Sequence, residues 1–362
     1  MELRFGFGMN PADLGEVCSV AAAAEAVGYD RVGIWDSPAL YRDPWVTLAS
    51  VAAATSTLRI GTWVTNPLTR HPVVTASAAA SLDALAPGRV VLGIGTGDSG
   101  VYNLGGRAAP LERLAAYVHV VRGLLTEGTA RWEGHDLRMP PAEHPVPIWV
   151  AAHGAKAIRT AGAIGDGVIF GLGVAPDTVR DCLAMLERGA SEAGRDAAEL
   201  ETWFTAPWYV DEDGEAAREA ALWHVASLAH HISRTGTVGK LIPPPYAAGI
   251  VELGTAYDLL SHGAPTAEQR EDYRRIARRT GVADYLVDRY TIAGTPQECA
   301  QQVRASAAAG ARNHDCANDS PAGQLWRRPD AWATHVLPQL VPTKLDPPQL
   351  DPSQLQERNA HV

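Results

Sequence analysis

The sequence predicts an α/β protein, a single (β/α)8 TIM barrel with a long helical insertion between strands 7 and 8. Short apolar segments alternate with longer segments in which Ala, Val and Leu recur at helical spacing, as βαβ units require. Eight such units fit within the 362 residues, and a barrel of about 250 residues with insertions reaches this length. Several predicted strands also end in Thr, Asn, Gly or Asp. Polar groups are therefore expected to gather at one rim of the barrel.

Four strands and three helices make up the first half of the predicted barrel. The strands are Leu3–Met9, Arg31–Asp36, residues 59–66 and residues 90–97, and the helices are Asp13–Val27, Pro44–Ala54 and Val74–Leu85. Gly28 follows the first helix and Pro87-Gly88 follows the third, and both are residues that end helices.

The second half continues the same alternation and is then interrupted. The helices are Leu111–Leu125, Ala155–Ile164, Asp177–Ala193 and Pro296–Ala309, and the strands are Pro147–His153, Gly167–Gly173, Glu201–Val210 and Ala311–Ala317. The alternation is lost from residue 212 to about residue 290, where a mostly helical insertion is expected. An insertion of this length is usually functional or an interface, and it is expected either to roof the barrel mouth or to help a dimer form.

The barrel is expected to span residues 1–340, and residues 341–362 are expected to be a disordered tail. The tail contains a near-repeat, Leu345-Asp346-Pro347-Pro348 and Leu350-Asp351-Pro352-Ser353. Such a Pro-rich polar segment has too few apolar residues to bury a core.

Composition favours a cytoplasmic enzyme with a small-molecule substrate. The formal net charge is −10, which argues against binding to nucleic acid or to an anionic membrane surface. The four cysteines are scattered without a C-x-x-C pair, as expected for reduced thiols in the cytoplasm. No apolar run approaches the roughly 18 residues of a membrane-spanning helix.

A helix begins directly after the predicted fifth strand, at Gly154 and Ala155. Free N–H groups and the helix dipole at such a position can bind a phosphate group. Lys156 would add positive charge, although a lysine in a first helical turn is commonly just solvated. A phosphate site is therefore predicted at this end of the strand.

Motifs spread over residues 1–312 resemble the luciferase-like (bacterial luciferase) superfamily. They are most similar to the branch of methylenetetrahydromethanopterin reductase and other enzymes that use the deazaflavin coenzyme F420. The matching motifs are Trp35-Asp36, Val64-Thr65-Asn66-Pro67 with Arg70 and Pro72, Gly93-Ile94-Gly95-Thr96-Gly97-Asp98, Ala152-His153-Gly154-Ala155-Lys156, Gly165-Asp166-Gly167 and Gly294-Thr295-Pro296. The resemblance implies coenzyme F420 as cofactor, with flavin mononucleotide (FMN) as the alternative.

The resemblance also implies a place for each part of the cofactor. A non-prolyl cis peptide is expected at Trp63-Val64, where the Val64 side chain would support the back of the ring. Thr65 and Asn66 would bind the polar edge of the ring, or would act only as turn formers. The cofactor-binding residues implied are Trp63, Val64, Thr65, Asn66, Gly97, Asp98, Gly154, Ala155, Lys156, Gly171 and Leu172.

Three residues are candidates for catalysis. Asp98 ends a Gly-rich strand, and burial beside an aromatic ring would raise its pKa so that it could donate a proton; alternatively, it caps the next turn. Asp36 matches the resembled family, but Ser37 stands where the F420 branch usually has a histidine. His153 is a possible replacement, because an imidazole titrates near neutral pH.

The predicted function is hydride transfer between C5 of F420 and a small imine, iminium, activated alkene or alcohol substrate. The alternatives are an FMN-dependent monooxygenase on the same fold and a non-catalytic flavin-binding protein.

A metal site is not expected. His314, Asp315 and Cys316 lack a second cluster at ligand spacing. The adjacent His230 and His231 would point to different faces of a helix. A homodimer is expected.

Overall fold

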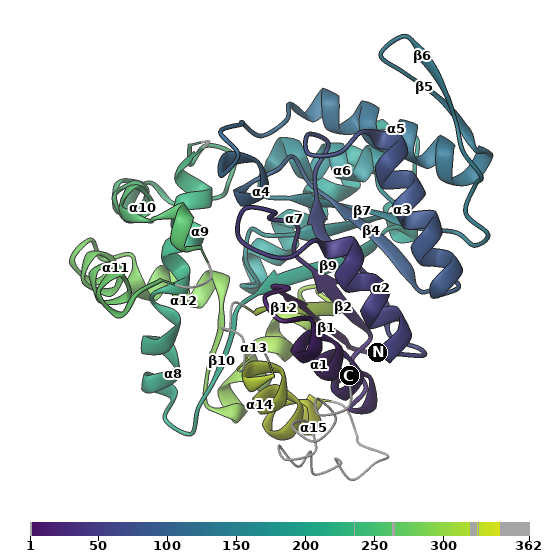
Figure 1. Ribbon diagram of the computed structural model, residues 1–362. Coiled ribbons are helices and arrows are strands. Elements are labelled where there is room, and N and C mark those ends of the chain that lie inside the picture. The colour runs from purple at the N-terminus through teal and green to yellow at the C-terminus, as the bar shows by residue number, and fades with distance from the viewer. Residues whose placement is uncertain (1, 235, 263–264, 319–323, 325, 341–362) are drawn as a thin grey trace.

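Eight parallel strands close into a barrel in the computed structural model, which describes residues 2–234, 236–262, 265–318, 324 and 326–340 (Figure 1). Neighbouring strands follow the order β1-β12-β9-β8-β7-β4-β3-β2. These strands are β1 (Arg4–Met9), β2 (Arg31–Ile34), β3 (Arg59–Thr65), β4 (Val90–Ile94), β7 (Ile148–Ala152), β8 (Gly167–Phe170), β9 (Glu201–Ala206) and β12 (Asn313–Asn318). Because all of the barrel pairs are parallel, the carboxyl ends share one mouth. The predicted (β/α)8 fold class is confirmed.

Several helices around the barrel begin where a side chain binds free N–H groups of the first turn. Asp13 and Asp43 do so for α1 and α2, and Thr295 forms a capping box with Glu298 at α13. The outer helices are α1 (Leu14–Ala26), α2 (Pro44–Ala54), α3 (Pro72–Leu85), α5 (Leu111–Glu127), α6 (Ala155–Ile164), α7 (Pro176–Glu192) and α13 (Pro296–Ala308). These local signals explain why the sequence placed the outer helices to within a few residues.

The inside of the barrel holds a charged pair among tryptophans. Arg31 on β2 binds Asp315 on β12, and their side chains are 3% and 0% exposed. The Arg31 guanidinium also lies 3.2 Å from the centre of the Trp63 ring. A glycine makes room for this stack, because a Cβ at Gly33 would lie 2.5 Å from the Cβ of Trp63. The filling of the barrel therefore depends on long-range pairs that no single strand specifies.

The predicted seventh strand, Glu201–Val210, is wrong as one continuous strand. The chain leaves the barrel at Pro207, which has no N–H to donate to a neighbouring strand. The following β10 (Trp208–Val210) pairs with β11 (Ile292–Gly294) outside the barrel. This small sheet connects the barrel to the beginning and the end of the insertion.

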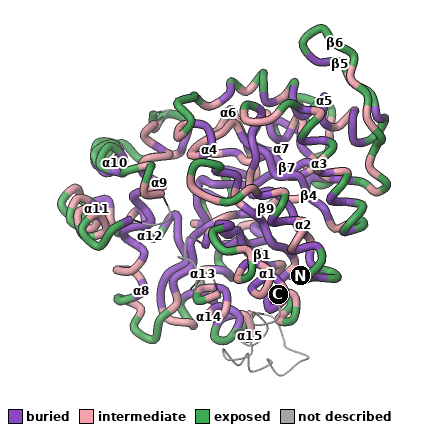
Figure 2. Tube along the Cα trace, viewed as in Figure 1, coloured by how far each residue is buried: buried purple, intermediate pink, exposed green. Residues whose placement is uncertain are grey.

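Several short elements were not predicted from the sequence. They are the hairpin of β5 (Thr129–Trp132) and β6 (His135–Arg138), helices α4 (Ser99–Tyr102), α14 (Arg327–His335) and α15 (Leu337–Leu340), and 3-10 turns at Ala197–Glu199 and Leu259–Ser261. The hairpin projects from the body and is largely exposed (Figure 2). All of these elements except α14 have four residues or fewer, which is too short to show a recognisable periodicity.

The described residues between 212 and 290 fold mainly into helices, as expected, at one side of the barrel in Figure 1. The helices are α8 (Gly214–Ala221), α9 (His224–Arg234), α10 (Pro244–Ala256), α11 (Ala267–Arg279) and α12 (Ala283–Tyr290). They pack around a hydrophobic core of their own, which includes Trp223, Leu253 and Tyr273 and is separate from the core between barrel and outer helices. The insertion is thus a compact helical unit rather than a long loop.

The tail predicted to be disordered, residues 341–362, lies outside the described residues. Within the described ranges, no helix combines the length and the apolar character needed to cross a bilayer.

Candidate active site at the barrel mouth

Strand β3 ends at the mouth in an irregular segment that aims Val64 over two glycines. Its register against β4 shifts between Thr62 and Thr65, and the Trp63-Val64 peptide is cis, as the resemblance implied. A Cβ at Gly93 or Gly95 would lie 3.1 or 3.2 Å from a Val64 methyl group. The glycines of β4 thus let the Val64 side chain lie across the barrel opening.

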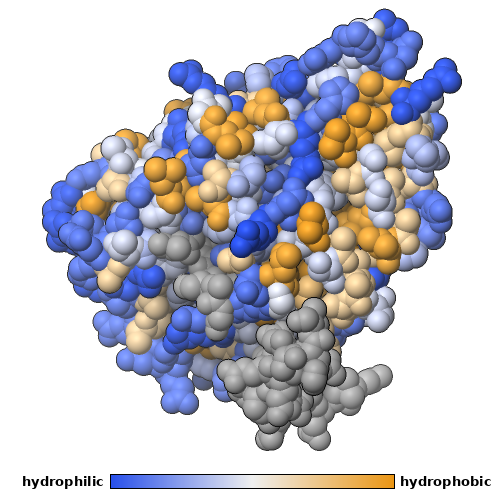
Figure 3. Space-filling model, viewed as in Figure 1, coloured by the Kyte–Doolittle hydropathy of each residue, from blue (hydrophilic) through white to orange (hydrophobic). Residues whose placement is uncertain are grey.

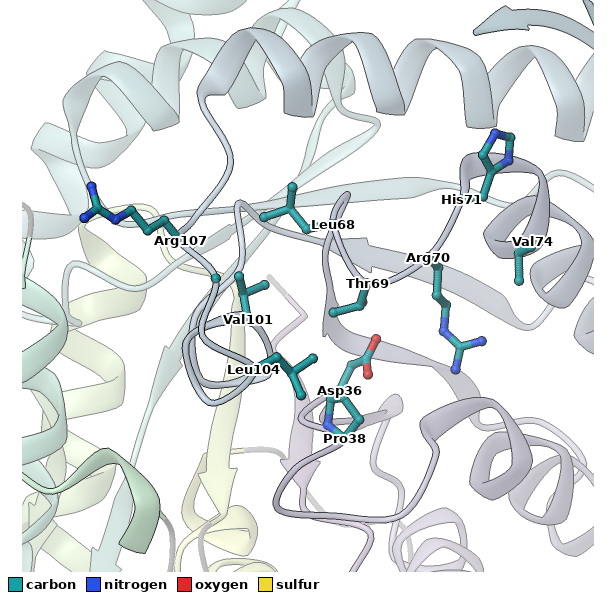
Figure 4. Close-up of a pocket in the computed structure, with 11 residues that line it drawn as sticks. Asp36, Pro38, Leu68, Thr69, Arg70, His71, Val74, Val101, Leu104 and Arg107 are labelled. Atoms are coloured by element: carbon teal, nitrogen blue, oxygen red, sulfur yellow. The ribbon is translucent and has the colours of Figure 1, made fainter. Parts of the chain in front are cut away.

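A cavity of about 840 Å³ opens beside this segment (Figure 4). Asp36 lies at its base, with Arg70 and Arg107 on opposite sides. The other lining residues are Pro38, Leu68, Thr69, His71, Val74, Val101, Leu104 and Gly106. Loops after β2, β3 and β4 therefore form one hollow at the carboxyl ends of the strands, where barrel enzymes bind their ligands.

Asp36 is buried at 6% exposure and accepts a hydrogen bond from the Thr65 hydroxyl at 2.6 Å. Burial raises the pKa of Asp36, although the Thr65 hydrogen bond and the nearby Arg70 oppose the rise. Ser37 contacts Ser99 through their hydroxyl oxygens at 2.5 Å. Position 37 therefore supplies a hydroxyl, already paired with its neighbour, and no titratable group.

Asn66 and Gly97 have local roles at the mouth. The side-chain oxygen of Asn66 accepts hydrogen bonds from the backbone N–H groups of Leu68 and Thr69, each at 3.0 Å. Gly97 has a φ of 99°, and a Cβ there would lie 2.6 Å from a Val101 methyl group. Asn66 thus forms the turn that was the alternative to ring binding, and its amide nitrogen is the group that remains for a ligand.

The expectation of a raised pKa at Asp98 is wrong. Partial burial alone would raise it, but His231 and Arg234 outweigh burial and hold the pKa of this carboxyl well below its usual range. The Asp98 Oδ2 atom lies 2.8 Å from Nδ1 of His231, and Oδ1 binds the Arg234 guanidinium. Asp98 is therefore an ionised carboxylate at neutral pH and has no proton to donate.

His153 extends from the end of β7 into the same region. Its ring centroid is 4.2 Å from that of His231, and its enclosed Nδ1 has no hydrogen-bond partner among the described residues. Burial, with a further contribution from His231, holds the pKa of His153 well below its usual range. Gly171 is required beside it, because a Cβ there would overlap the imidazole. A neutral imidazole with an unused nitrogen thus lies under the insertion.

The predicted phosphate site is covered by the insertion. The Ala155 N–H donates to the Gly239 carbonyl at 2.9 Å, so this group is not free as the sequence had suggested. The Leu172 carbonyl accepts from Arg289 Nε at 3.0 Å. A ligand phosphate would have to displace the Gly239 carbonyl in order to bind this N–H group.

The Lys156 side chain does not point toward the predicted phosphate site. It is exposed and lines a separate groove of about 410 Å³ with Arg159 and Glu192 on the outer surface. Lys240 of the insertion is the lysine beside Gly154, since a Cβ at Gly154 would lie 3.8 Å from Lys240 Cγ. Lys240 is 6% exposed, and burial lowers its pKa to about 8.

Sequence reasoning missed the residues that the insertion brings to the mouth, namely His231, Arg234 and Lys240. From the sequence, the adjacent pair His230-His231 suggests at most a weak metal site. In the structure His231 contacts Asp98, whereas His230 lies 2.9 Å from the Gly254 carbonyl. The only sequence signal was that these histidines lie in a long insertion with an expected position over the mouth.

The residues His314, Asp315 and Cys316 do not form a metal site. His314 contacts the Ala311 carbonyl and stacks beside Phe5, while Asp315 binds Arg31 inside the barrel. No cluster of three or more potential metal ligands occurs in the part of the chain that the structure describes.

His314 is expected to make stability depend on pH. Burial lowers its pKa from 6.5 to about 4, so between these values the unfolded chain binds a proton that the folded chain does not. Stability from this residue is present above about pH 6.5 and is lost as pH falls through 4, by about 3 kcal/mol in total. His314→Phe should therefore gain about 3 kcal/mol relative to the wild type between about pH 7 and pH 4.

Urea denaturation of both proteins across this pH range measures the difference. A difference in unfolding free energy that stays constant with pH would contradict the burial of a neutral His314.

Comparison with known proteins gives the chain's relationships. Residues 4–313 match the family described as luciferase-like monooxygenase. An F420-dependent glucose-6-phosphate dehydrogenase of Nakamurella multipartita is 35% identical over 250 residues, covering 62% of this chain and 74% of the relative. A 5,10-methylenetetrahydromethanopterin reductase of Methanolobus tindarius is 28% identical over 309 residues, covering 83% and 90%.

The fold also matches solved structures. The coenzyme F420 dependent tetrahydromethanopterin reductase of Methanopyrus kandleri superposes with a TM-score of 0.73 at 21% identity, covering 94% of this chain and all of the other.

Proposed function

The chain belongs to the luciferase-like monooxygenase family of oxidoreductases, and from this premise we propose that it is an F420-dependent enzyme. It would transfer hydride between C5 of the deazaflavin and a small substrate, either an unsaturated imine, iminium or activated alkene or an alcohol. The observation that carries this proposal is the barrel mouth, where Val64 projects from an irregular strand end over Gly93 and Gly95. The F420-dependent relatives make this cofactor the first candidate.

The residues at the mouth fit a flat cofactor. Gly93 and Gly95 leave room for Val64, which offers an apolar surface, and Gly171 leaves room for the His153 ring. The unpartnered Nδ1 of His153 is a polar atom that a ligand could satisfy. Val64 would support the ring and Thr65 and Asn66 its edge, whereas the Trp63 side chain packs on Arg31 inside the barrel. Gly154 and Ala155 would bind the phosphate once it displaces the Gly239 carbonyl.

When bound, the cofactor would accept or donate the hydride, and the protein would position the substrate and exclude water. Asp36, with its raised pKa and its bond to Thr65, would hold a hydroxyl or amine group of the ligand. His153 would hydrogen-bond the ligand as a neutral imidazole. Asp98, being ionised, would act through the cations that it binds.

Titration of the purified protein with F420 and with FMN tests the cofactor. Under the proposal, F420 binds with a change in its absorption and fluorescence and is reduced when glucose 6-phosphate or 2-propanol is added as a probe alcohol. FMN binding with oxygen consumption would instead indicate the monooxygenase alternative. Binding without turnover, across alcohol and imine probes in both directions, would indicate a flavin-binding protein.

Gly154→Asp is expected to raise the dissociation constant for F420 by about tenfold or more, because a carboxylate within about 4 Å of the phosphate repels it. A side chain fits there, since the nearest atom to a Cβ would be the Gly239 oxygen at 3.7 Å. Fluorescence titration measures the effect. Lys156→Ala is the matched control and should change the constant less than about threefold, because Lys156 lies in the outer groove. Unchanged affinity in Gly154→Asp would move the phosphate site elsewhere.

We further propose a homodimer formed through α2 and α3. Helix α2 has no charged residue, and the one charge on α3, Asp83, is fully buried. Val46, Val74 and Leu85 on these helices are 60%, 46% and 60% exposed. Apolar residues gather on this side of the molecule (Figure 3). Surface helices without charge are typical of an interface.

Val46→Glu is expected to convert the dimer into a monomer, because it places a charge in the apolar face. Sedimentation equilibrium measures the mass. A wild type that sediments as a monomer, or a variant that remains a dimer, would contradict this interface.

We also propose that the protein acts in the cytoplasm, where its four free cysteines would stay reduced.

A further inference from the structure

An Asp–His pair joins the barrel to the insertion at the mouth. His231 on α9 lies 133 residues after Asp98, yet its Nδ1 is 2.8 Å from the Asp98 carboxylate. Arg234, one helical turn further on, binds the other oxygen of the same carboxylate. The His231 side chain is 31% exposed, and no described residue hydrogen-bonds its Nε2. The ring is thus fixed at one nitrogen and open at the other.

We propose that His231 is the residue that takes up and delivers the substrate proton, and that Asp98 is the positioning residue that orients it. This inference rests on the proposed oxidoreductase function. It places the acid–base residue in the insertion, whereas the sequence analysis predicts it at the strand ends.

The carboxylate selects the useful tautomer of His231. An ionised Asp98 can only accept a hydrogen bond, so the Nδ1 atom of neutral His231 must carry the proton. The Nε2 atom then has a free lone pair directed away from Asp98. A histidine oriented in this way by a carboxylate is a general base in one direction and, once protonated, a general acid in the other.

The groups around His231 include one carboxylate and several basic side chains. Asp98 stabilises the imidazolium form through the direct pair. Arg234 and His230 on α9, His153 on β7, and Lys240 and His262 in the segments after α9 and α10 are the other titratable or charged groups here. These groups are basic, so they favour the neutral ring. His231 therefore lies between one carboxylate and several basic groups, and only the carboxylate is bonded to its ring.

The other candidates are less suited to moving a proton. Asp98 is already ionised. His153 is kept neutral by burial, and Ser37 and Ser99 are paired with each other. Lys240 donates to the His231 and Ile232 carbonyls at 3.1 and 2.5 Å. Of these mouth groups, His231 alone combines an open nitrogen with an anionic partner.

The proton balance of alcohol oxidation follows from this arrangement. The O–H bond of the alcohol breaks, and its proton moves to Nε2 of His231. The C–H bond at the carbon that bears this oxygen would break, and the hydrogen would leave with the electron pair of that bond as hydride, which the deazaflavin of the proposed function would accept. The electron pair of the broken O–H bond would form the second bond between carbon and oxygen. The alcohol becomes a carbonyl compound, and His231 becomes an imidazolium paired with Asp98. In the reverse direction His231 returns the proton to the oxygen.

Kinetics of the F420-loaded protein with the probe alcohols test the proposal first. His231→Ala is expected to lower kcat by about 10²- to 10³-fold with little change in KM. In the wild type, kcat/KM for alcohol oxidation should rise with pH, and this ascending limb should be lost in the variant. Added imidazole should restore at least about tenfold of the lost rate, as a base supplied from solution would. His135→Gln, an exposed histidine on the hairpin that projects from the body, is the matched control.

The tautomer of His231 provides a second readout that needs neither cofactor nor substrate. In the 15N spectrum of the protein without cofactor, neutral His231 should carry its proton on Nδ1, with the signal assigned by its loss in His231→Ala. Asp98→Ala should remove this preference.

Each outcome separates the inference from the proposed function. Wild-type turnover that His231→Ala leaves intact, or a loss that imidazole does not restore, would overturn the role of His231. A proton on Nε2 would overturn it as well, whichever substrate is used. If the wild type turns over no probe, the proposed function fails. The tautomer measurement still tests whether Asp98 orients His231 with Nε2 free to act as a base.

Discussion

Arg31→Met is expected to lower the free energy of unfolding by about 3 to 5 kcal/mol, because it leaves the Asp315 carboxyl in the barrel without its cation. The side chains of this pair are 3% and 0% exposed, so water cannot replace the lost partner. The Arg31 guanidinium also lies over the Trp63 ring, and that contact would be lost too. Urea denaturation followed by tryptophan fluorescence measures the change.

The double variant Arg31→Met/Asp315→Leu is the control for this prediction. Replacing both members of a buried pair by apolar residues of similar volume is often neutral or stabilising. The double variant should therefore recover most of the stability that Arg31→Met loses. A single variant within about 1 kcal/mol of the wild type would show that the pair is not buried as described.

The penalty of Arg31→Met should also depend on pH. Burial raises the pKa of Asp315 from 3.8 to about 7, although Arg31 opposes the rise. Between these values the folded chain binds a proton that the unfolded chain has released. Asp315 thus contributes stability that is present below about pH 4 and is lost as pH rises through about 7. The loss caused by Arg31→Met should be smaller at about pH 5 than at about pH 8.

Asp98→Asn is expected to lower kcat by at least about 100-fold while changing the F420 dissociation constant by less than about threefold. A neutral amide no longer balances Arg234 and no longer fixes the proton of His231 on Nδ1. Because the pKa of Asp98 lies well below its usual range, the titration of Asp98 itself should not shape the activity profile near neutral pH. Steady-state kinetics and fluorescence titration give the two numbers.

Asp177→Asn, an exposed carboxylate at the start of α7, is the matched control and should behave as the wild type. If Asp98→Asn instead weakens cofactor binding as much as turnover, Asp98 acts mainly on the cofactor. If both quantities match the wild type, Asp98 has no part in the reaction.

The barrel could be predicted from sequence because its signals are local. Arg31–Asp36 and residues 59–66 are apolar segments with polar ends, and both correspond to barrel strands. Thr295 and Glu298 mark the start of a helix by their spacing alone. The break at Pro207 was not predicted, because the partner of the segment after it, β11, comes more than 80 residues later.

The candidate site was predictable only in outline. The glycines of β4 and the polar end of β3 indicated where a ligand would lie, since the carboxyl ends of parallel strands meet at one mouth. The pKa of Asp98 was predicted in the wrong direction because it depends on charges from α9. Lys240 could not be predicted beside Gly154, because the two residues are 86 positions apart in the sequence and meet only in the fold.

The order of strands and helices, the starts of the outer helices and the rim at which polar groups collect could all be predicted from residues close together in the chain. These follow from hydrophobic periodicity and capping, which act over a few residues. Which charged groups meet depends on the folded chain: Arg31 binds Asp315 inside the barrel, and Asp98 contacts His231 at its mouth. Electrostatic energy depends on the distance between charges in space and on their burial. Neither quantity can be calculated from the spacing of residues along the chain.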